Sequence, residues 1–182
     1  SQTDVIERQV RAARKAADFV VVGVHWGVED SHTIVDSQRT LAQNLADWGA
    51  DVIVGTHPHV LQDAQWLTAA DGRETFVAYS LGNFLSTQNR PDELVGAILT
   101  LQFQKTTDSD GTVHLAVLEP KLHPTVTHYN TGKTDVRTYL FKDYTTELAQ
   151  KHGVREKYPE FNLENIRQIA QKNISSEFLE LA

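Results

Sequence analysis

The strongest constraint on the fold is a strand, a helix and a second strand that follow one another within residues 19–55. Residues 19–24 are apolar without alternation, which predicts a strand covered on both faces. Apolar side chains of residues 36–48 recur at helical spacing, and Gly49 marks the end of that helix. Residues 51–55 predict the second strand. The strands of such a βαβ unit are parallel, so their carboxyl ends lie at the same edge of the sheet.

Histidines follow both predicted strands. His25 comes directly after the first, and His57 and His59 come directly after the second, with Pro58 stiffening the loop between them. Imidazole is the commonest protein ligand for transition metals, although most isolated histidine pairs are ordinary core or surface residues. Because the edge formed by the carboxyl ends of parallel strands is the usual place for a site in an α/β sheet, the three histidines together predict a metal site there.

Periodicity and turn composition predict the remaining elements. They are a helix over 4–17, a short third strand over 75–79 after a turn at 71–72, an antiparallel hairpin of 94–104 and 112–118, a short strand over 126–129, and helices over 143–152 and 162–173. Loops are expected at 133–137 and 153–159. The sequence therefore predicts an α/β fold in which a βαβ unit is followed by antiparallel strands and C-terminal helices.

Composition narrows the possible partners and ligands. The 182 residues, 40% of them hydrophobic, are enough for one domain with a full core. A net charge of −7 without a basic stripe argues against binding to nucleic acid. The absence of cysteine leaves nitrogen and oxygen ligands, which suit zinc, manganese, iron or magnesium. Apolar stretches such as 19–24 are far shorter than the ~20 residues of a membrane-spanning helix.

Two further polar residues are candidates for the site, each with open alternatives. Glu29 can orient a ligating imidazole, bind substrate, act as an acid or base, or be an ordinary solvated carboxylate. Asn83 can cap a loop through its side chain or contact a phosphate. His32 is expected to be exposed to solvent, and Trp26 and Trp48 are expected to pack in the core.

Three stretches together resemble one known family. Their order and spacing are similar to those of the CapA (PgsA-like) poly-γ-glutamate capsule biosynthesis family, itself similar to the calcineurin-like metallophosphatases. The stretches are Val24-His25-Trp26-Gly27-Val28-Glu29, residues 49–62 with Gly55-Thr56-His57-Pro58-His59 at their centre, and Tyr79-Ser80-Leu81-Gly82-Asn83-Phe84. The resemblance covers about residues 4–120. It suggests a CapA-like domain part over residues 1–130 and a helical C-terminal extension over 131–182.

The resemblance implies an αββα metallophosphatase-like sandwich with a site for two divalent ions, manganese, zinc or iron. It assigns metal ligation to His25, His57 and His59, and it matches Glu29 and Asn83, as well as Gln62, to motif positions of less certain role. The family's other ligands, including a bridging aspartate, are expected upstream. We therefore expect the chain to be the C-terminal half of such a domain, to hold one ion or none by itself, and to be inactive alone.

Three hypotheses for function follow from the resemblance. In the first, the intact protein acts in capsule biosynthesis through a metal-dependent, phosphoesterase-like site on the capsule polymer or a phosphoester substrate. In the second, it is a non-catalytic cell-surface subunit that binds the capsule polymer or its membrane synthase subunits. The third is a general nucleotide or phosphodiester hydrolase. The resemblance places the protein at the outer face of the membrane, anchored by a segment outside this sequence.

Overall fold

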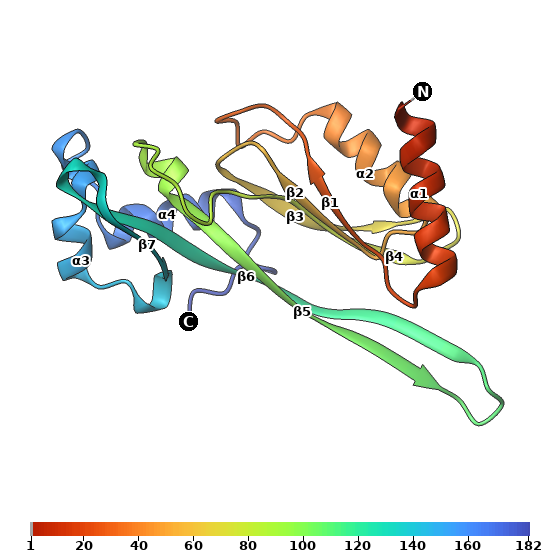
Figure 1. The fold of residues 1–182 in the computed structure, drawn as a ribbon. Helices are drawn as coiled ribbons and strands as arrows, with labels where there is room; N and C mark the ends of the chain where they lie inside the picture. Colours follow the sequence, from red (N-terminus) through yellow and green to blue (C-terminus); the bar gives the residue numbers. More distant parts are fainter. Residues whose placement is uncertain (1) are drawn as a thin grey trace.

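A four-stranded sheet forms the first part of the computed structural model, which describes residues 2–182 (Figure 1). Its strands are β1 (Val21–His25), β2 (Val52–Thr56), β3 (Leu61–Thr68) and β4 (Glu74–Leu81), in the spatial order β1-β2-β4-β3. β1, β2 and β4 are parallel, and β3 pairs with β4 in the antiparallel direction. The predicted βαβ unit is therefore confirmed.

Two helices cover one face of this sheet (Figure 1). They are α1 (Gln2–Ala16) and α2 (Asp36–Trp48), and α2 ends at Gly49 as the sequence predicts. Val10 of α1 and Leu45 of α2 pack with Ile53 and Val77 of the sheet in one buried cluster. Trp26 and Trp48 belong to the same cluster, so the expectation that both tryptophans pack in the core is confirmed.

The opposite face of the central strands packs in a second core. Val52 and Phe76 belong to this core, whereas their neighbours Ile53 and Val77 belong to the helix-covered one. Successive side chains of a strand point to opposite faces, so β2 and β4 are buried on both sides. This double burial explains why the central residues of both strands, 52–54 and 76–79, are apolar.

A three-stranded antiparallel sheet contributes to the second core. It consists of β5 (Val95–Thr107), β6 (Val113–Asn130) and β7 (Thr134–Leu140), and the short 3₁₀ helix η1 (Pro91–Leu94) leads into it. The far ends of β5 and β6 form a hairpin that projects from the body of the molecule (Figure 1). Phe103, Val113 and Leu115 are exposed hydrophobic side chains of these strands.

Short helices complete the chain. They are η2 (Thr131–Lys133), η3 (Phe141–Asp143), α3 (Thr146–Lys151), η4 (Gly153–Glu156) and α4 (Leu163–Asn173). All of them except η2 contribute buried residues to the same core. Ile166 of α4 and Phe178 are buried in the cluster that also holds Leu122 of β6. The division of the chain at residue 130 stays a prediction. None of the helices within residues 2–182 is long and apolar enough to cross a membrane.

The prediction that the first strand is covered on both faces is wrong. β1 lies at the edge of its sheet, and the side chain of Val21 is 55% exposed. Val22 and Val24 pack against the helix-covered core, while the alternate residues of the strand face outward. An unbroken apolar run gives no sign of which face lacks a partner, because both faces carry the same type of side chain.

The structure corrects the predicted elements at four further places. The sequence did not predict β3, which mixes polar and apolar residues without a regular pattern shortly after the histidine motif. Residues 126–129 do not form a separate strand, because they continue β6. Residues 134–137, expected in a loop, begin β7, where pairing with β6 outweighs a polar, exposed sequence. The helix expected over 143–152 is divided between η3 and α3.

Two buried histidines lie where β6 meets the C-terminal helices. His152 is 2% exposed, its Nε2 donates to the carbonyl oxygen of Thr127 at 2.9 Å, and its Nδ1 accepts from the amide of Val154 at 3.0 Å. The ring of His128 lies 5.0 Å from that of His152. Burial lowers the pKa of His152 to about 4, because a charged ring would lose its hydration and its acceptor role.

Protonation of His152 should therefore destabilise the fold in mild acid. The pKa of the His152 ring is about 6.5 in the unfolded protein and about 4 in the folded protein. The free energy of unfolding therefore decreases as the pH drops from 6.5 toward 4. We expect His152 alone to lower the free energy of unfolding by about 2 kcal/mol between pH 7 and pH 5. Denaturant titrations across this range measure the effect.

The matched control is the exposed His114 on the hairpin. The variant His152→Gln should lose the part of the pH dependence that His152 contributes, whereas His114→Gln should keep it. Equal pH dependence in the protein and in His152→Gln would contradict the assignment.

Candidate functional site

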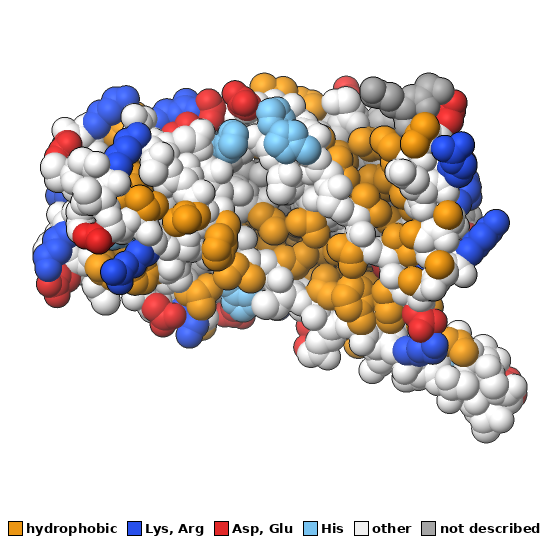
Figure 2. Space-filling model, in the orientation of Figure 1, with side chains coloured by type: hydrophobic (Ala, Val, Ile, Leu, Met, Phe, Trp, Pro, Cys, Tyr) orange, Lys and Arg blue, Asp and Glu red, His pale blue; other side chains and the backbone are white. Residues whose placement is uncertain are grey.

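The candidate site lies where β1 and β2 end at the same edge of the sheet. His25 pairs with Thr56 in the parallel register, and the amide of Trp26 donates to the carbonyl oxygen of Thr56 at 3.1 Å. Beyond this point the chain leaves β1 into the loop with Glu29 and leaves β2 into the loop with His57. Figure 2 shows that histidine side chains gather at the surface along one edge of the molecule.

A close approach between β2 and β4 brings this edge together. A Cβ atom on Gly55 would lie 1.9 Å from the carbonyl oxygen of Tyr79 and 2.4 Å from Nε1 of Trp26. The same Trp26 nitrogen donates to the Tyr79 carbonyl at 2.8 Å. Glycine at position 55 therefore allows the three segments to meet directly beneath the histidine loop.

The backbone of the two loops is strained. His57 has φ 103° and His59 has φ 61°, and Asp30 in the neighbouring loop also has φ 61°. Residues other than glycine rarely adopt such angles, and each costs about 1–3 kcal/mol when the surroundings impose it. The amide of Asp30 donates to the carbonyl oxygen of Pro58 at 2.8 Å and so ties the two strained loops together.

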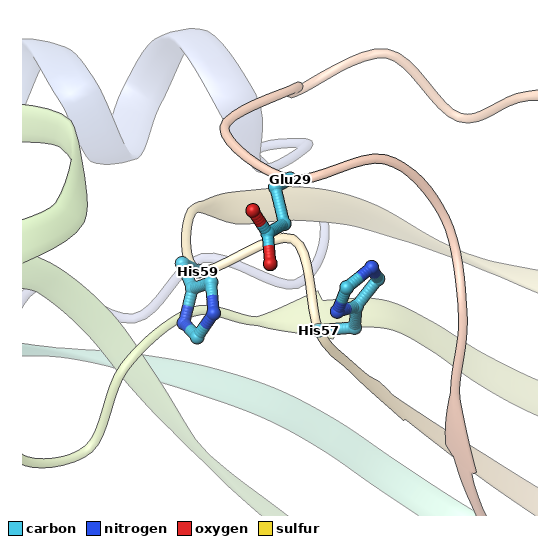
Figure 3. A group of neighbouring side chains, drawn as sticks. All are labelled: Glu29, His57 and His59. Atoms are coloured by element: carbon cyan, nitrogen blue, oxygen red, sulfur yellow. The ribbon is translucent and has the colours of Figure 1, made fainter.

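These loops bring together one carboxylate and two imidazoles. Glu29, His57 and His59 each offer a ligand atom, and the three atoms lie within 4.8 Å of one another. Figure 3 shows the Glu29 carboxylate between the two rings. Nitrogen and carboxylate oxygen donors at such spacing fit a divalent transition metal. Glu29 is exposed to solvent and lies beside both imidazoles, and its role stays a prediction.

His25 lies next to this group on the side of His57. The centroids of the His25 and His57 rings are 4.4 Å apart, and Nδ1 of His25 lies 3.4 Å from the hydroxyl of Thr56. The rings of His57 and His59 are 6.3 Å apart. The structure therefore places all three histidines at one edge, with Glu29 rather than His25 completing the tight group; ligation by His25 stays a prediction.

Asn83, which follows β4, orients His59. Its Oδ1 accepts from Nδ1 of His59 at 2.9 Å, and its amide nitrogen donates to the carbonyl oxygens of His59 at 3.2 Å and of Glu93 at 3.0 Å. A ring that donates through Nδ1 leaves the lone pair of Nε2 free for a ligand, which is the usual arrangement around metal-binding histidines. These bonds agree with the prediction that Asn83 caps a loop through its side chain.

His32 was expected to be exposed, and this prediction is wrong. Its side chain is half-buried, with Nδ1 2.6 Å from the carbonyl oxygen of Leu61 and Nε2 3.1 Å from Asp92. The hydrogen bond to Asp92 raises the pKa of His32, and the same bond lowers the pKa of Asp92. No local pattern could reveal this pair, because the partners are 60 residues apart in the sequence.

A second ion pair joins the same two segments. Asp30 contacts the guanidinium of Arg90, which also bonds to the buried carboxylate of Glu93 at 2.7 Å. The sequence reading did not identify these three residues. They link the Glu29 loop to the segment between β4 and β5, which also contains Asn83.

The fold and the site together define an α/β protein with a histidine and carboxylate group at the carboxyl ends of parallel strands. Residues 1–88 match the model of the family described as bacterial capsule synthesis protein PGA_cap. The chain is 46% identical over 79 residues to the PGA biosynthesis protein CapA of Bacillus subtilis (strain 168). It is 40% identical over 89 residues to the capsule biosynthesis protein CapA of Bacillus anthracis.

These matches cover 43% and 47% of this chain and 20% of each relative. The resemblance to the CapA capsule biosynthesis family that the three sequence motifs predict is therefore confirmed over residues 1–88. The matched segment contains Glu29, the three site histidines and Asn83.

Replacing Gly55 should disturb the strand ends beneath the site. Gly55→Ala forces a methyl group against the Tyr79 backbone, so we expect a loss of about 1–3 kcal/mol or more in the free energy of unfolding. Gly23→Ala on β1 is the matched control, because a Cβ there meets nothing within 4 Å, and its effect should stay within about 0.5 kcal/mol. Chemical denaturation of both variants measures the difference; equal stabilities would contradict the close approach.

Proposed function

We propose that the protein acts in capsule biosynthesis as a divalent-metal-dependent, phosphoesterase-like enzyme whose site includes Glu29, His57 and His59. The observation that carries the proposal is the convergence of these three donors within 4.8 Å at the ends of two parallel strands. The names of the CapA relatives from two Bacillus species support the link to capsule and PGA biosynthesis. The substrate is the capsule polymer or a phosphoester related to it.

The donor set fits one divalent ion of the manganese, zinc or iron type. Glu29, His57 and His59 would hold it, with His25 close enough to His57 to serve as a further ligand. A divalent ion in such a site supplies Lewis-acid chemistry and lowers the pKa of water. Residues 2–182 bring together this one group of three, so a second ion would need ligands from elsewhere in the whole protein, and we expect this chain alone to be inactive.

The residues of the chain have separate tasks in this proposal. Glu29 contributes negative charge between the two rings and can accept a proton from a substrate or water at its free oxygen. Asn83 keeps Nδ1 of His59 as a donor and so directs Nε2 toward the group. The bond between Asp30 and Pro58 holds the two loops at a fixed separation.

A second candidate function is binding without catalysis, as a cell-surface subunit that contacts the membrane synthase. The projecting hairpin favours it, because Phe103, Val113 and Leu115 expose apolar surface of the kind that protein partners cover. A net charge of −7 disfavours simple electrostatic capture of an anionic polymer by this chain. In either case we propose that the whole protein is anchored at the outer face of the membrane.

Removal of one ligand tests the catalytic proposal. In the whole protein with Mn²⁺ or Zn²⁺, His57→Ala should lower kcat/KM for phosphodiester hydrolysis by about 100-fold or more, because the metal's contribution of several kcal/mol corresponds to more than two decades in rate. A screen of nucleotide and polymer-linked esters identifies the substrate. His114→Ala on the hairpin is the matched control and should leave the activity unchanged.

Full activity of His57→Ala would end the catalytic claim. Capture of the synthase subunits by a variant that lacks all three site histidines, together with loss of capture in Phe103→Ser, would then favour the binding function.

A further inference from the structure

The loop that carries Glu29 has neither helix nor strand between residues 26 and 35, so polar contacts determine its position. Besides the contacts of Asp30 with Arg90 and of His32 with Asp92, backbone groups of the loop make three hydrogen bonds to its neighbours. One bond joins it to the histidine loop, from the amide of Asp30 to the carbonyl oxygen of Pro58. Two more come from the side-chain amide of Gln62, which donates to the carbonyl oxygens of Ser31 at 2.9 Å and of Thr33 at 3.1 Å.

Gln62 connects this loop to the strand that follows the histidines. It lies on β3, three residues after His59, and its register partner on β4 is Ser80. Its side chain is 0% exposed. A buried amide in a paired strand has little freedom to move, so the two carbonyl oxygens that it binds are held at a fixed distance from the start of β3.

Gln38 of α2 completes the network beneath Gln62. Its Nε2 donates to Oε1 of Gln62 at 2.8 Å, and its own Oε1 accepts from the amide of Val35 at 3.1 Å. Gln38 is 1% exposed. Both hydrogens and the oxygen of the Gln62 amide are therefore used, which leaves a single orientation for that side chain. The network joins α2, β3 and the Glu29 loop.

We propose that Gln62, held by Gln38, is a positioning residue that sets the spacing between the Glu29 carboxylate and the imidazoles of His57 and His59. Its effect on metal affinity rests on the proposed function, but its effect on the loop does not. Without the Gln62 amide, the Ser31 and Thr33 carbonyls lose their buried donor, and the loop that carries Glu29 separates more readily from the histidine loop.

A matched control lies on the same strand. Gln65 of β3 donates through its Nε2 to the hydroxyl of Tyr79 at 2.9 Å and has no hydrogen bond to the Glu29 loop. Gln65→Leu and Gln62→Leu both remove a side-chain amide from β3. Both variants can lower stability, but only Gln62→Leu changes the tether of the Glu29 loop.

Titration calorimetry with Zn²⁺ on the whole protein tests the effect on affinity. Gln62→Leu should raise the Kd about 10- to 100-fold, as loss of a supporting residue around a metal site does. The Kd of Gln65→Leu should stay within about twofold of the value for the unaltered protein. All titrations are made at the same temperature, and circular dichroism shows that both variants are folded. If Gln62→Leu does not fold, Gln38→Leu replaces it. An unchanged Kd in the Gln62 variant would overturn the proposal.

Hydrogen–deuterium exchange of the metal-free protein tests the positioning itself. Amides of residues 28–33 should exchange about tenfold faster in Gln62→Leu, because loss of a buried hydrogen bond lowers the free energy of local opening. In Gln65→Leu the same amides should exchange at the rate of the unaltered protein. If the unaltered protein does not bind Zn²⁺, the proposed function fails and the exchange rates alone decide. Equal exchange in the two variants would overturn the positioning role.

Discussion

The candidate site depends above all on the parallel pairing of β1 with β2. This pairing runs in unbroken register from Val21 opposite Val52 to His25 opposite Thr56, so the two strands end together. The chain then leaves them in adjacent loops, one with a carboxylate and one with two imidazoles. An antiparallel pair would place these loops at opposite ends of the sheet. The direction of one strand pair thus determines whether the donors can meet.

The two loops meet in strained conformations, and buried polar contacts hold them there. Positive φ angles at His57 and His59 cost free energy that the amide network around Gln62 and the bond from Asp30 to Pro58 help to offset. Asn83 fixes the orientation of one ring from the end of a third parallel strand, β4. A site assembled in this way is preorganised, because its donors converge through contacts within the chain.

The sequence predicted the elements whose signals are local. The apolar runs, the helical spacing before Gly49 and the turn residues of the hairpin were sufficient for the βαβ unit and for β5 with β6. The prediction failed where contacts between distant residues determine the structure. β3 is a strand because it pairs with β4, and His32 is half-buried because it contacts Asp92. The residues of the site were all named from the sequence, but their grouping required three-dimensional distances. Glu29, and not His25, forms the group of three with His57 and His59.

The most direct test of this account is the anomalous scattering of a crystal of the protein grown with Zn²⁺ or Mn²⁺. We expect a metal peak in contact with the Glu29 carboxylate and with a ring nitrogen of each of His57 and His59. A structure in which these rings point apart, or in which the metal lies elsewhere and leaves the three side chains without it, would contradict the central claim.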